Sequence, residues 1–264
     1  MQVVDVHTHI YPDKIAERAA QSIGEFYNIP MEVQDGSVAR LSNSMGHSKV
    51  SRCVVHSVAV RPGTVRSIND FIARTCDEHH EFVGFMTLHQ DTEDMAAEIE
   101  HACDMGLCGI KLHPDTQQVN MDDDRLMRAY EIAERKRLPL IIHCGDYRYD
   151  YSHPRRLKRI LHEFPNLVVN AAHFGGWSVY DLALEYLEDE RCFLDVSSSM
   201  RYLGLRRTRE LIEDYGYDRI LFGSDFPMWS PEGVLDSFMQ LGFSDAAYER
   251  MCLRNCERFL GLDL

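Results

Sequence analysis

Short apolar runs alternate with amphipathic stretches along this 264-residue chain, and this alternation limits its fold more than any other feature. Each run is rich in valine, isoleucine, leucine or phenylalanine and is bounded by turn residues, as strands buried on both faces are. The predicted strands span residues 3–9, 52–60, 82–89, 108–113, 138–143, 167–173, 192–196 and 219–223. Eight strands that alternate with helices predict one α/β domain over residues 1–264, a (β/α)8 barrel with a parallel sheet.

The segments between the strands carry helix signals. Residues 122–137 begin with three aspartates and end in Arg-Lys-Arg, which suits the positive and negative ends of a helix. Gly261 follows the last predicted helix, 244–260, and glycine commonly terminates helices. The other predicted helices span residues 64–80, 91–104, 154–163, 178–189, 206–215 and 231–241. A doubly wound open sheet is the alternative, but no glycine-rich fingerprint follows the first strand.

Residues 11–49 are too numerous for a plain first connection. They contain a helix-like stretch, 13–23, followed by an irregular stretch around Pro30, Gly36 and Gly46. In a barrel the first connection lies at the mouth, where active sites are found. We therefore expect residues 11–49 to form an extended connection that covers a substrate. A surface loop without a role is the alternative.

The composition narrows the classes of partner. Asp plus Glu number 42 against 28 Lys plus Arg, giving a formal net charge of −14. Such a surface repels nucleic acid and anionic membranes.

No apolar run approaches the ~20 residues of a membrane span, and the first residues lack the pattern of a signal peptide. The eight cysteines form no CxxC pair, so we expect reduced thiols in a cytoplasmic protein that acts on a small molecule.

Histidines stand at the ends of several predicted strands. The first strand ends in His7 and His9, the fifth in His143 and the sixth in His173, while Asp225 follows the eighth. The carboxyl ends of parallel barrel strands converge on one rim, and alternate residues of a strand share a face. A single histidine there would commonly be a buried polar residue, but the joint placement predicts a divalent metal site. Zn²⁺ suits these ligands, with Fe²⁺, Mn²⁺ or Co²⁺ as alternatives.

Five motifs carry a family resemblance: VDVHTHIYP, GIKLHP, LIIHCGD, AAHFGG and LFGSDFP, in this order between residues 3 and 227. Together they resemble the amidohydrolase superfamily, in particular its branch of metal-dependent hydrolases and decarboxylases typified by aminocarboxymuconate semialdehyde decarboxylase. The resemblance implies a TIM barrel with one divalent ion, usually zinc, bound by His7, His9, His143 and Asp225. It also implies that His173 contacts the bound water or the substrate. A homodimer is implied by the resemblance alone.

Lys111 and His113 end the fourth predicted strand. Binuclear members of the superfamily carry a carboxylated lysine there that bridges two metals, whereas the single-metal branch does not require this lysine as a ligand. We favour a single metal, and we treat Lys111 and His113 as contacts either to a second metal or to the substrate.

Weaker candidates follow other strands. Arg61, Arg148 and Arg201 come after the second, fifth and seventh predicted strands, where a guanidinium can bind a substrate carboxylate through two hydrogen bonds. His153 precedes a proline, so it is either a substrate contact or part of a helix start. Tyr11 is expected to line the pocket. Each of these residues has a surface or packing role as its alternative.

The predicted ligands define a reaction. A divalent ion with an open coordination position lowers the pKa of bound water from about 15.7 toward about 7. Asp225 is the expected general base, and His173 is expected to stabilise charge on the substrate. We expect hydrolysis of a small C–N or C–O bonded substrate, such as an amide or a lactone. Decarboxylation of a small unsaturated or aromatic acid is the alternative, which a rim arginine would favour, and a catalytically silent metal-binding barrel is the third.

Overall fold

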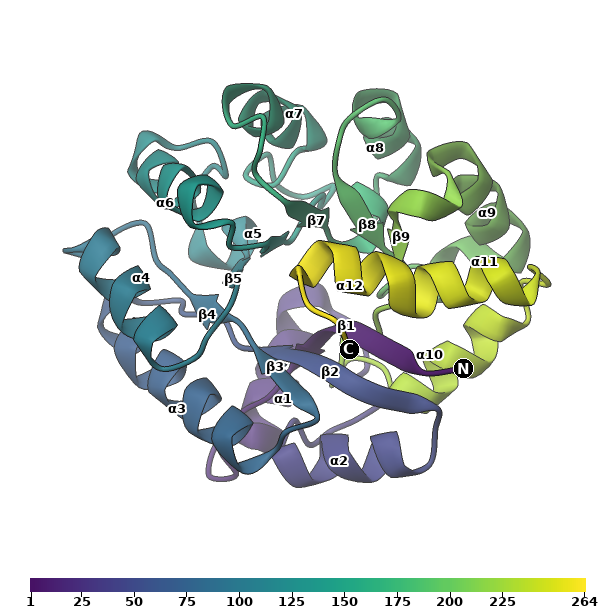
Figure 1. Cartoon of the computed structure of the whole chain (residues 1–264), viewed down its shortest axis with the longest axis horizontal. Coiled ribbons are helices and arrows are strands. Elements are labelled where there is room, and N and C mark those ends of the chain that lie inside the picture. The colour runs from purple at the N-terminus through teal and green to yellow at the C-terminus, as the bar shows by residue number, and fades with distance from the viewer.

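A computed structural model describes all 264 residues, and its strands follow the predicted order (Figure 1). The strands are β1 (Val3–His9), β2 (Val50–His56), β3 (Phe82–Gly84), β4 (Met86–Thr87), β5 (Ile110–Leu112), β6 (Leu140–Ile142), β7 (Val169–Ala171), β8 (Phe193–Asp195) and β9 (Ile220–Leu221). All strand pairs are parallel. β3 and β4 are two parts of one predicted strand, interrupted at Phe85.

Backbone hydrogen bonds close the strands into a barrel. The strands pair in the orders β1–β2–β3 and β4–β5–β6–β7–β8–β9. At the remaining seam, the Val6 N–H donates to the Phe222 carbonyl over 3.0 Å, and the Asp225 N–H donates to the His7 carbonyl over 2.8 Å. β1 therefore lies beside the segment that follows β9, and the predicted (β/α)8 barrel is confirmed.

Helices surround the strands (Figure 1). They are α1 (Ala16–Tyr27), α2 (Val38–Gly46), α3 (Val65–Glu78), α4 (Met95–Asp104), α5 (Pro114–Gln117), α6 (Asp124–Lys136), α7 (Pro154–Glu163), α8 (Tyr180–Leu187), α9 (Met200–Tyr215), α10 (Pro231–Met239), α11 (Asp245–Glu249) and α12 (Asn255–Leu260). None of these helices combines the length and the apolar character that crossing a membrane requires. The eight cysteines are all unpaired thiols.

Besides α5, which has no predicted counterpart, and α1, which ends at Tyr27 instead of residue 23, the helices depart from the prediction at three places. The predicted helix 244–260 is two helices, α11 and α12, joined by the π-helical stretch Arg250–Arg254. α9 begins six residues before the predicted helix 206–215, because Gly204, with φ of 68°, kinks it without ending it. Residues 38–46 form α2 where an irregular stretch was predicted. The glycines that suggested a loop flank this helix or end it.

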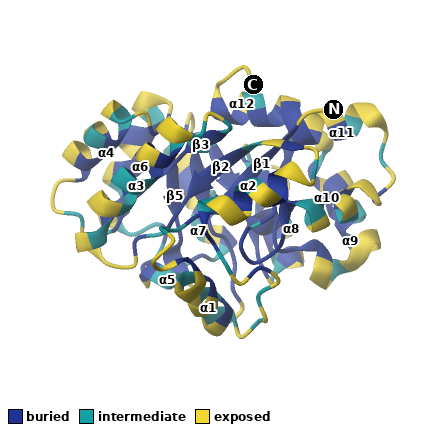
Figure 2. Ribbon diagram, turned by 90° about the horizontal axis from the view of Figure 1, so that it is seen from below, coloured by how far each residue is buried: buried dark blue, intermediate teal, exposed yellow.

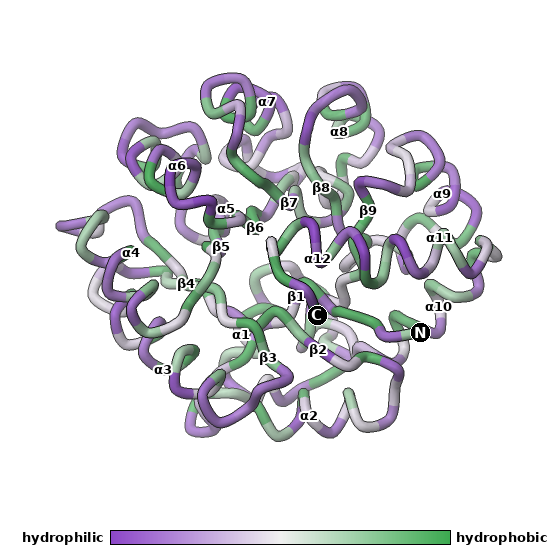
Figure 3. Tube along the Cα trace, in the orientation of Figure 1, coloured by the Kyte–Doolittle hydropathy of each residue, from purple (hydrophilic) through white to green (hydrophobic).

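Apolar side chains fill the barrel at the end opposite its mouth. Ten buried residues form this cluster: Val4, Val6, Val54, Phe85, Ile141, Leu221, Leu253, Cys256, Phe259 and Leu260. The rings of Phe85 and Phe259 lie 6.1 Å apart, and Gly109 has no side chain where a Cβ would overlap the Phe85 ring. A larger apolar cluster separates the strands from the helices. Figures 2 and 3 show the same division, with buried, hydrophobic strands inside and exposed, hydrophilic helix faces outside.

The long first connection divides into two parts. α1 lies at the opposite end of the barrel from α12 (Figure 2), over the carboxyl ends of the strands. α2 packs against β2 and α10 on the outside of the barrel, as an ordinary crossover helix does. Only the first part of residues 11–49 therefore covers the mouth.

The Phe85 ring provides a test of the closed barrel interior. Phe85→Ala should lower the free energy of unfolding by about 3–5 kcal/mol, because it leaves a cavity among side chains held by both ends of the chain. Urea denaturation measures this change. Tyr147→Ala, at a side chain that is 72% exposed, is the control and should change stability by no more than about 0.5 kcal/mol. A similarly small change for Phe85→Ala would show that the interior is not closed by this ring.

Candidate metal centre

A cavity of about 390 Å³ opens at the carboxyl ends of the strands. Its lining includes every predicted ligand and catalytic group, together with both residues of the fourth predicted strand: His7, His9, Lys111, His113, His143, His173 and Asp225. Ala19, Ile23 and Phe26 of α1 line its cover, and Val58 and Val60 line one wall. The cavity thus combines a polar floor with apolar walls.

His7 and His9 face Asp225 on this floor. Both histidines lie on one face of β1, because they are alternate residues of a strand. Asp225 Oδ1 lies 3.4 Å from His7 Nε2 and 3.5 Å from His9 Nε2. Two ligands that each lie about 2.1 Å from a tetrahedral ion are separated by about 3.4 Å. The distances from Asp225 to the two imidazoles therefore fit a shared divalent cation.

Asp195, at the end of β8, fixes the orientation of His7. Its Oδ2 lies 3.0 Å from His7 Nδ1, and it also accepts from the Asn170 amide and from the backbone N–H of His173. Burial alone would raise the pKa of Asp195, but His7 and His173 hold it well below its usual range. A carboxylate on Nδ1 turns Nε2 of His7 toward the cavity, which is the usual orientation of a metal-binding histidine.

Asp5 holds the backbone around these side chains. Its Oδ1 accepts the N–H of His7 and the N–H of Ser224, both over 3.0 Å. Burial raises the pKa of Asp5 to about 7. Asp5 therefore ties β1 to the residue before Asp225 and orients the ligands through the main chain.

His143 and His173 lie in the same cavity and contact each other. His173 Nε2 is 3.1 Å from His143 Nδ1. His143 Nε2 faces two acceptors, the Gly145 carbonyl at 3.1 Å and Asp115 Oδ2 at 3.3 Å. The Gly145 carbonyl can only accept, so Nε2 carries a proton, and Nδ1 faces His173. Burial lowers the pKa of His173 to about 3, so this imidazole is neutral.

Lys111 and His113 occupy different parts of the cavity. The buried Lys111 Nζ lies 2.8 Å from His7 Nε2, and burial lowers its pKa to about 8. The His113 ring stacks on His143 with centroids 3.9 Å apart, and its Nε2 lies 2.7 Å from the Tyr27 hydroxyl. Lys111 thus belongs to the group around His7, whereas His113 connects the floor to α1.

Of the five weaker candidates, the structure places Tyr11 in the cavity lining and the other four outside it. Arg61 is exposed after β2. His153 caps α7 by accepting a backbone N–H. Arg201 lies over the Trp229 ring, 4.8 Å from its centroid. These positions agree with the alternative roles: Arg61 lies on the surface, His153 caps a helix and Arg201 packs on an aromatic ring.

Arg148 clamps the cover instead of facing the cavity. It pairs with Asp146 over 2.7 Å, and its Nη1 donates to the Phe26 carbonyl of α1 over 2.6 Å. Its guanidinium also lies over the rings of Phe26 and Tyr149, 5.0 and 5.1 Å from their centroids. The arginine predicted to contact substrate therefore fixes the helix that covers the site.

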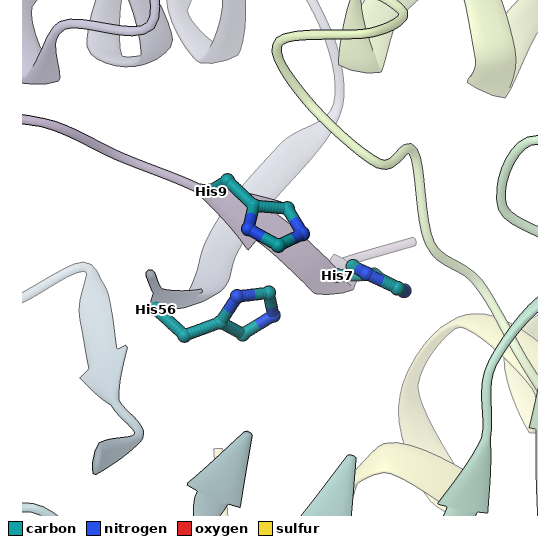
Figure 4. Close-up of side chains that lie close together, drawn as sticks. All are labelled: His7, His9 and His56. Atoms are coloured by element: carbon teal, nitrogen blue, oxygen red, sulfur yellow. The ribbon is translucent and has the colours of Figure 1, made fainter. Parts of the chain in front are cut away.

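Two residues that the sequence did not single out stand beside the centre. Tyr27 lies on α1, in a connection whose path cannot be read from the sequence. His56 ends β2 and lies beside His7 and His9 (Figure 4). The predicted strand ran on to residue 60, which placed His56 within the strand. A histidine at the end of a strand was the signal used for the other histidines. It could not single out His56, because the end of this strand was predicted four residues too late.

Comparison with known proteins identifies the family of the chain and several structures with a similar fold. A family model described as amidohydrolase matches residues 4–262. A TIM-barrel protein from Bordetella bronchiseptica is 19% identical, with a TM-score of 0.76 over 99% of each chain. A dihydroxybenzoic acid decarboxylase from a Polaromonas species, with bound manganese and the inhibitor 2-nitroresorcinol, is 16% identical, with a TM-score of 0.75 over 98% of this chain and 97% of that chain.

A third similar structure carries a different reaction in its description. It is a probable 2-pyrone-4,6-dicarboxylic acid hydrolase from Acinetobacter baumannii with citric acid bound. It is 14% identical, with a TM-score of 0.72, over 99% of this chain and 100% of that chain. At these identities the three structures establish the shared barrel fold.

Asp195 provides a test of the metal centre. Asp195→Asn should weaken divalent cation binding by about 10–100-fold, because His7 loses the carboxylate that orients its ring. Competition against a chromophoric chelator measures the affinity. Asp189→Asn, at an exposed side chain, is the matched control and should bind as the wild type does. Unchanged affinity in Asp195→Asn would remove Asp195 from the centre.

Proposed function

Because the chain belongs to the amidohydrolase family, we propose that it is a metal-dependent hydrolase of a small C–N or C–O bonded substrate, such as an amide or a lactone. The observation that carries this proposal is the position of Asp225 at 3.4 and 3.5 Å from two imidazoles on the cavity floor. A carboxylate that can both face a cation and accept a proton is what activation of water requires.

The donor atoms of the floor fit a divalent cation. His7, His9 and Asp225 would hold it, and His143, which lines the same cavity with its Nδ1 3.1 Å from His173 Nε2, is the proposed fourth ligand. When bound, such an ion acidifies coordinated water and polarises a carbonyl group. Zinc is the proposed ion, because imidazoles with one carboxylate suit it; iron, manganese and cobalt are the alternatives.

Asp225 is the proposed proton acceptor. Its Oδ2 accepts the hydroxyl of Ser198, which in turn accepts the Trp229 N–H over 2.9 Å. Although burial would raise its pKa, the neighbouring His7, His9 and His173 hold the pKa of Asp225 well below its usual range. Such a carboxylate is a weak base, so it suits a proton taken from an acidified nucleophile and passed on to the leaving group.

His173 is the proposed hydrogen-bond partner of the nucleophile or the substrate. Its Nδ1 lies 3.0 Å from the Ser197 carbonyl and 2.9 Å from Ser197 Oγ, and its Nε2 faces His143 and the cavity. The ring is neutral because burial lowers its pKa to about 3. Since the carbonyl only accepts, Nδ1 carries the proton, and Nε2 can accept a hydrogen bond from the nucleophile or from a substrate donor.

Decarboxylation of a small aromatic acid is the second candidate. Lys111 is the one cationic side chain in the cavity lining, where it can receive a carboxylate, and Tyr11, Phe26 and Tyr27 supply aromatic surface. The similar structures include a decarboxylase and a probable hydrolase. We rank hydrolysis first because none of the arginines, Arg61 included, lines the cavity.

A substrate panel separates these reactions. The metal-loaded protein should open lactones or cleave amides, measured as acid release at constant pH, without releasing CO₂ from aromatic acids. Chelation should abolish turnover, and added zinc should restore it. Release of CO₂ with no hydrolysis would replace the first candidate by the second. Absence of turnover with zinc, manganese, iron and cobalt would favour the silent barrel.

Asp225→Asn tests the proposed proton acceptor. The turnover number should fall by about 10²–10⁴-fold, because the amide cannot accept the proton. Circular dichroism and metal analysis report whether the fold and the bound ion are kept. Asp236→Asn, at an exposed side chain of α10, is the matched control and should retain full turnover. Activity in a metal-loaded Asp225→Asn protein would assign the proton transfer to another group.

A further inference from the structure

His56 adds a third imidazole to the face formed by His7 and His9 (Figure 4). It is the register partner of His9 across the β1–β2 pair, so the two side chains point to the same side of the sheet. The His56 ring lies 4.4 Å from that of His9 and 5.2 Å from that of His7, centroid to centroid. One ring nitrogen from each of the three histidines lies within 4.8 Å of the other two.

Unsatisfied nitrogens gather at this place. Both ring nitrogens of His56 and Nδ1 of His9 are buried and have no hydrogen-bond partner among the protein groups. Buried polar atoms normally have hydrogen-bond partners. His7 and His143 at the same centre have such partners, Asp195 for His7 Nδ1 and the Gly145 carbonyl for His143 Nε2. A side chain needed only for packing would be apolar here, because burying unpaired nitrogens costs free energy.

Two carboxyl groups lie beside this face. Asp225 Oδ1 is 3.4 Å from His7 Nε2 and 3.5 Å from His9 Nε2, and Asp195 Oδ2 is 3.0 Å from His7 Nδ1. Lys111 Nζ, 2.8 Å from His7 Nε2, is the one amine beside them. A divalent ion on this face would therefore meet oxygen ligands as well as the imidazoles.

We propose that His56 is a ligand of the divalent ion that His7 and His9 bind, so that three imidazoles from β1 and β2 face the ion. This inference rests on the metal centre of the proposed function. It adds a ligand from β2 to the set that the family resemblance implies. A fourth imidazole, beside those of His7, His9 and His143, shifts the preference of the centre toward zinc and away from manganese, because manganese favours oxygen ligands.

The test replaces His56 by leucine, which has a similar volume and no nitrogen. X-ray absorption of the zinc-loaded proteins should count one imidazole fewer per zinc in His56→Leu than in the wild type. Zinc affinity, measured against a competing chelator, should fall more than about 100-fold, beyond the 10–100-fold that loss of an outer hydrogen-bond partner causes. The metal-free variant should melt no lower than the metal-free wild type, because two unpaired nitrogens are removed.

The controls separate this inference from the proposed function. His162→Leu, at an exposed histidine, should match the wild type in zinc affinity and imidazole count. If His56→Leu does not fold, His56→Gln provides the same comparison with a polar side chain. Equal imidazole counts, or a loss of affinity below 100-fold, overturn the assignment of His56 while the wild-type metal centre and its activity stand. Failure of the wild type to bind any divalent ion overturns both proposals.

Discussion

The contact between His7 and Asp195 orders the centre of this molecule. A carboxylate at the end of β8 is removed from water only if donors surround it, and Asp195 collects them from the His7 ring, the Asn170 amide and the backbone N–H groups of His173 and Ser197. These donors belong to three different parts of the barrel. The need to satisfy one buried charge therefore fixes the positions of the first strand, the loop after β7 and the imidazole of His7 together.

The hydrogen bonds that close the barrel also bring the proposed ligands together. The seam between β1 and the segment after β9 is formed by backbone hydrogen bonds of His7 and Asp225, which are also proposed ligands. Asp5 accepts N–H groups from both sides of this seam. A chain that failed to close there would lose both its barrel and the approach of Asp225 to the two histidines.

The sequence predicted the barrel and most of its floor because both depend on local pattern. β1 was predicted with its observed bounds, since a short apolar run bounded by turn residues marks a strand buried on both faces. α7 was predicted because Pro154 marks its first residue. The predicted ligands and catalytic groups line one cavity, together with Lys111, His113 and Tyr11. Their roles as ligands and as catalytic groups stay predictions.

The site features that could not be predicted from the sequence depend on residues that become neighbours only in the folded chain. Val58 and Val60 continue the apolar pattern of β2, but they line the cavity wall, so the strand ends earlier and His56 takes the position beside His9. Arg148 follows a strand as a substrate-binding arginine would, yet Asp146, two residues earlier, accepts it and turns it toward α1. No periodicity distinguishes such partners.

The packing of α12 beneath the barrel has a consequence for synthesis. Val4 and Val6 share their apolar cluster with Leu253, Phe259 and Leu260, so the packing of the first strand to leave the ribosome is completed only by the last residues translated. Until then the histidines of β1 stand on an incomplete core. Contacts between such distant parts of a chain form slowly, so we expect the proposed ligands of β1 to reach their final surroundings late in folding.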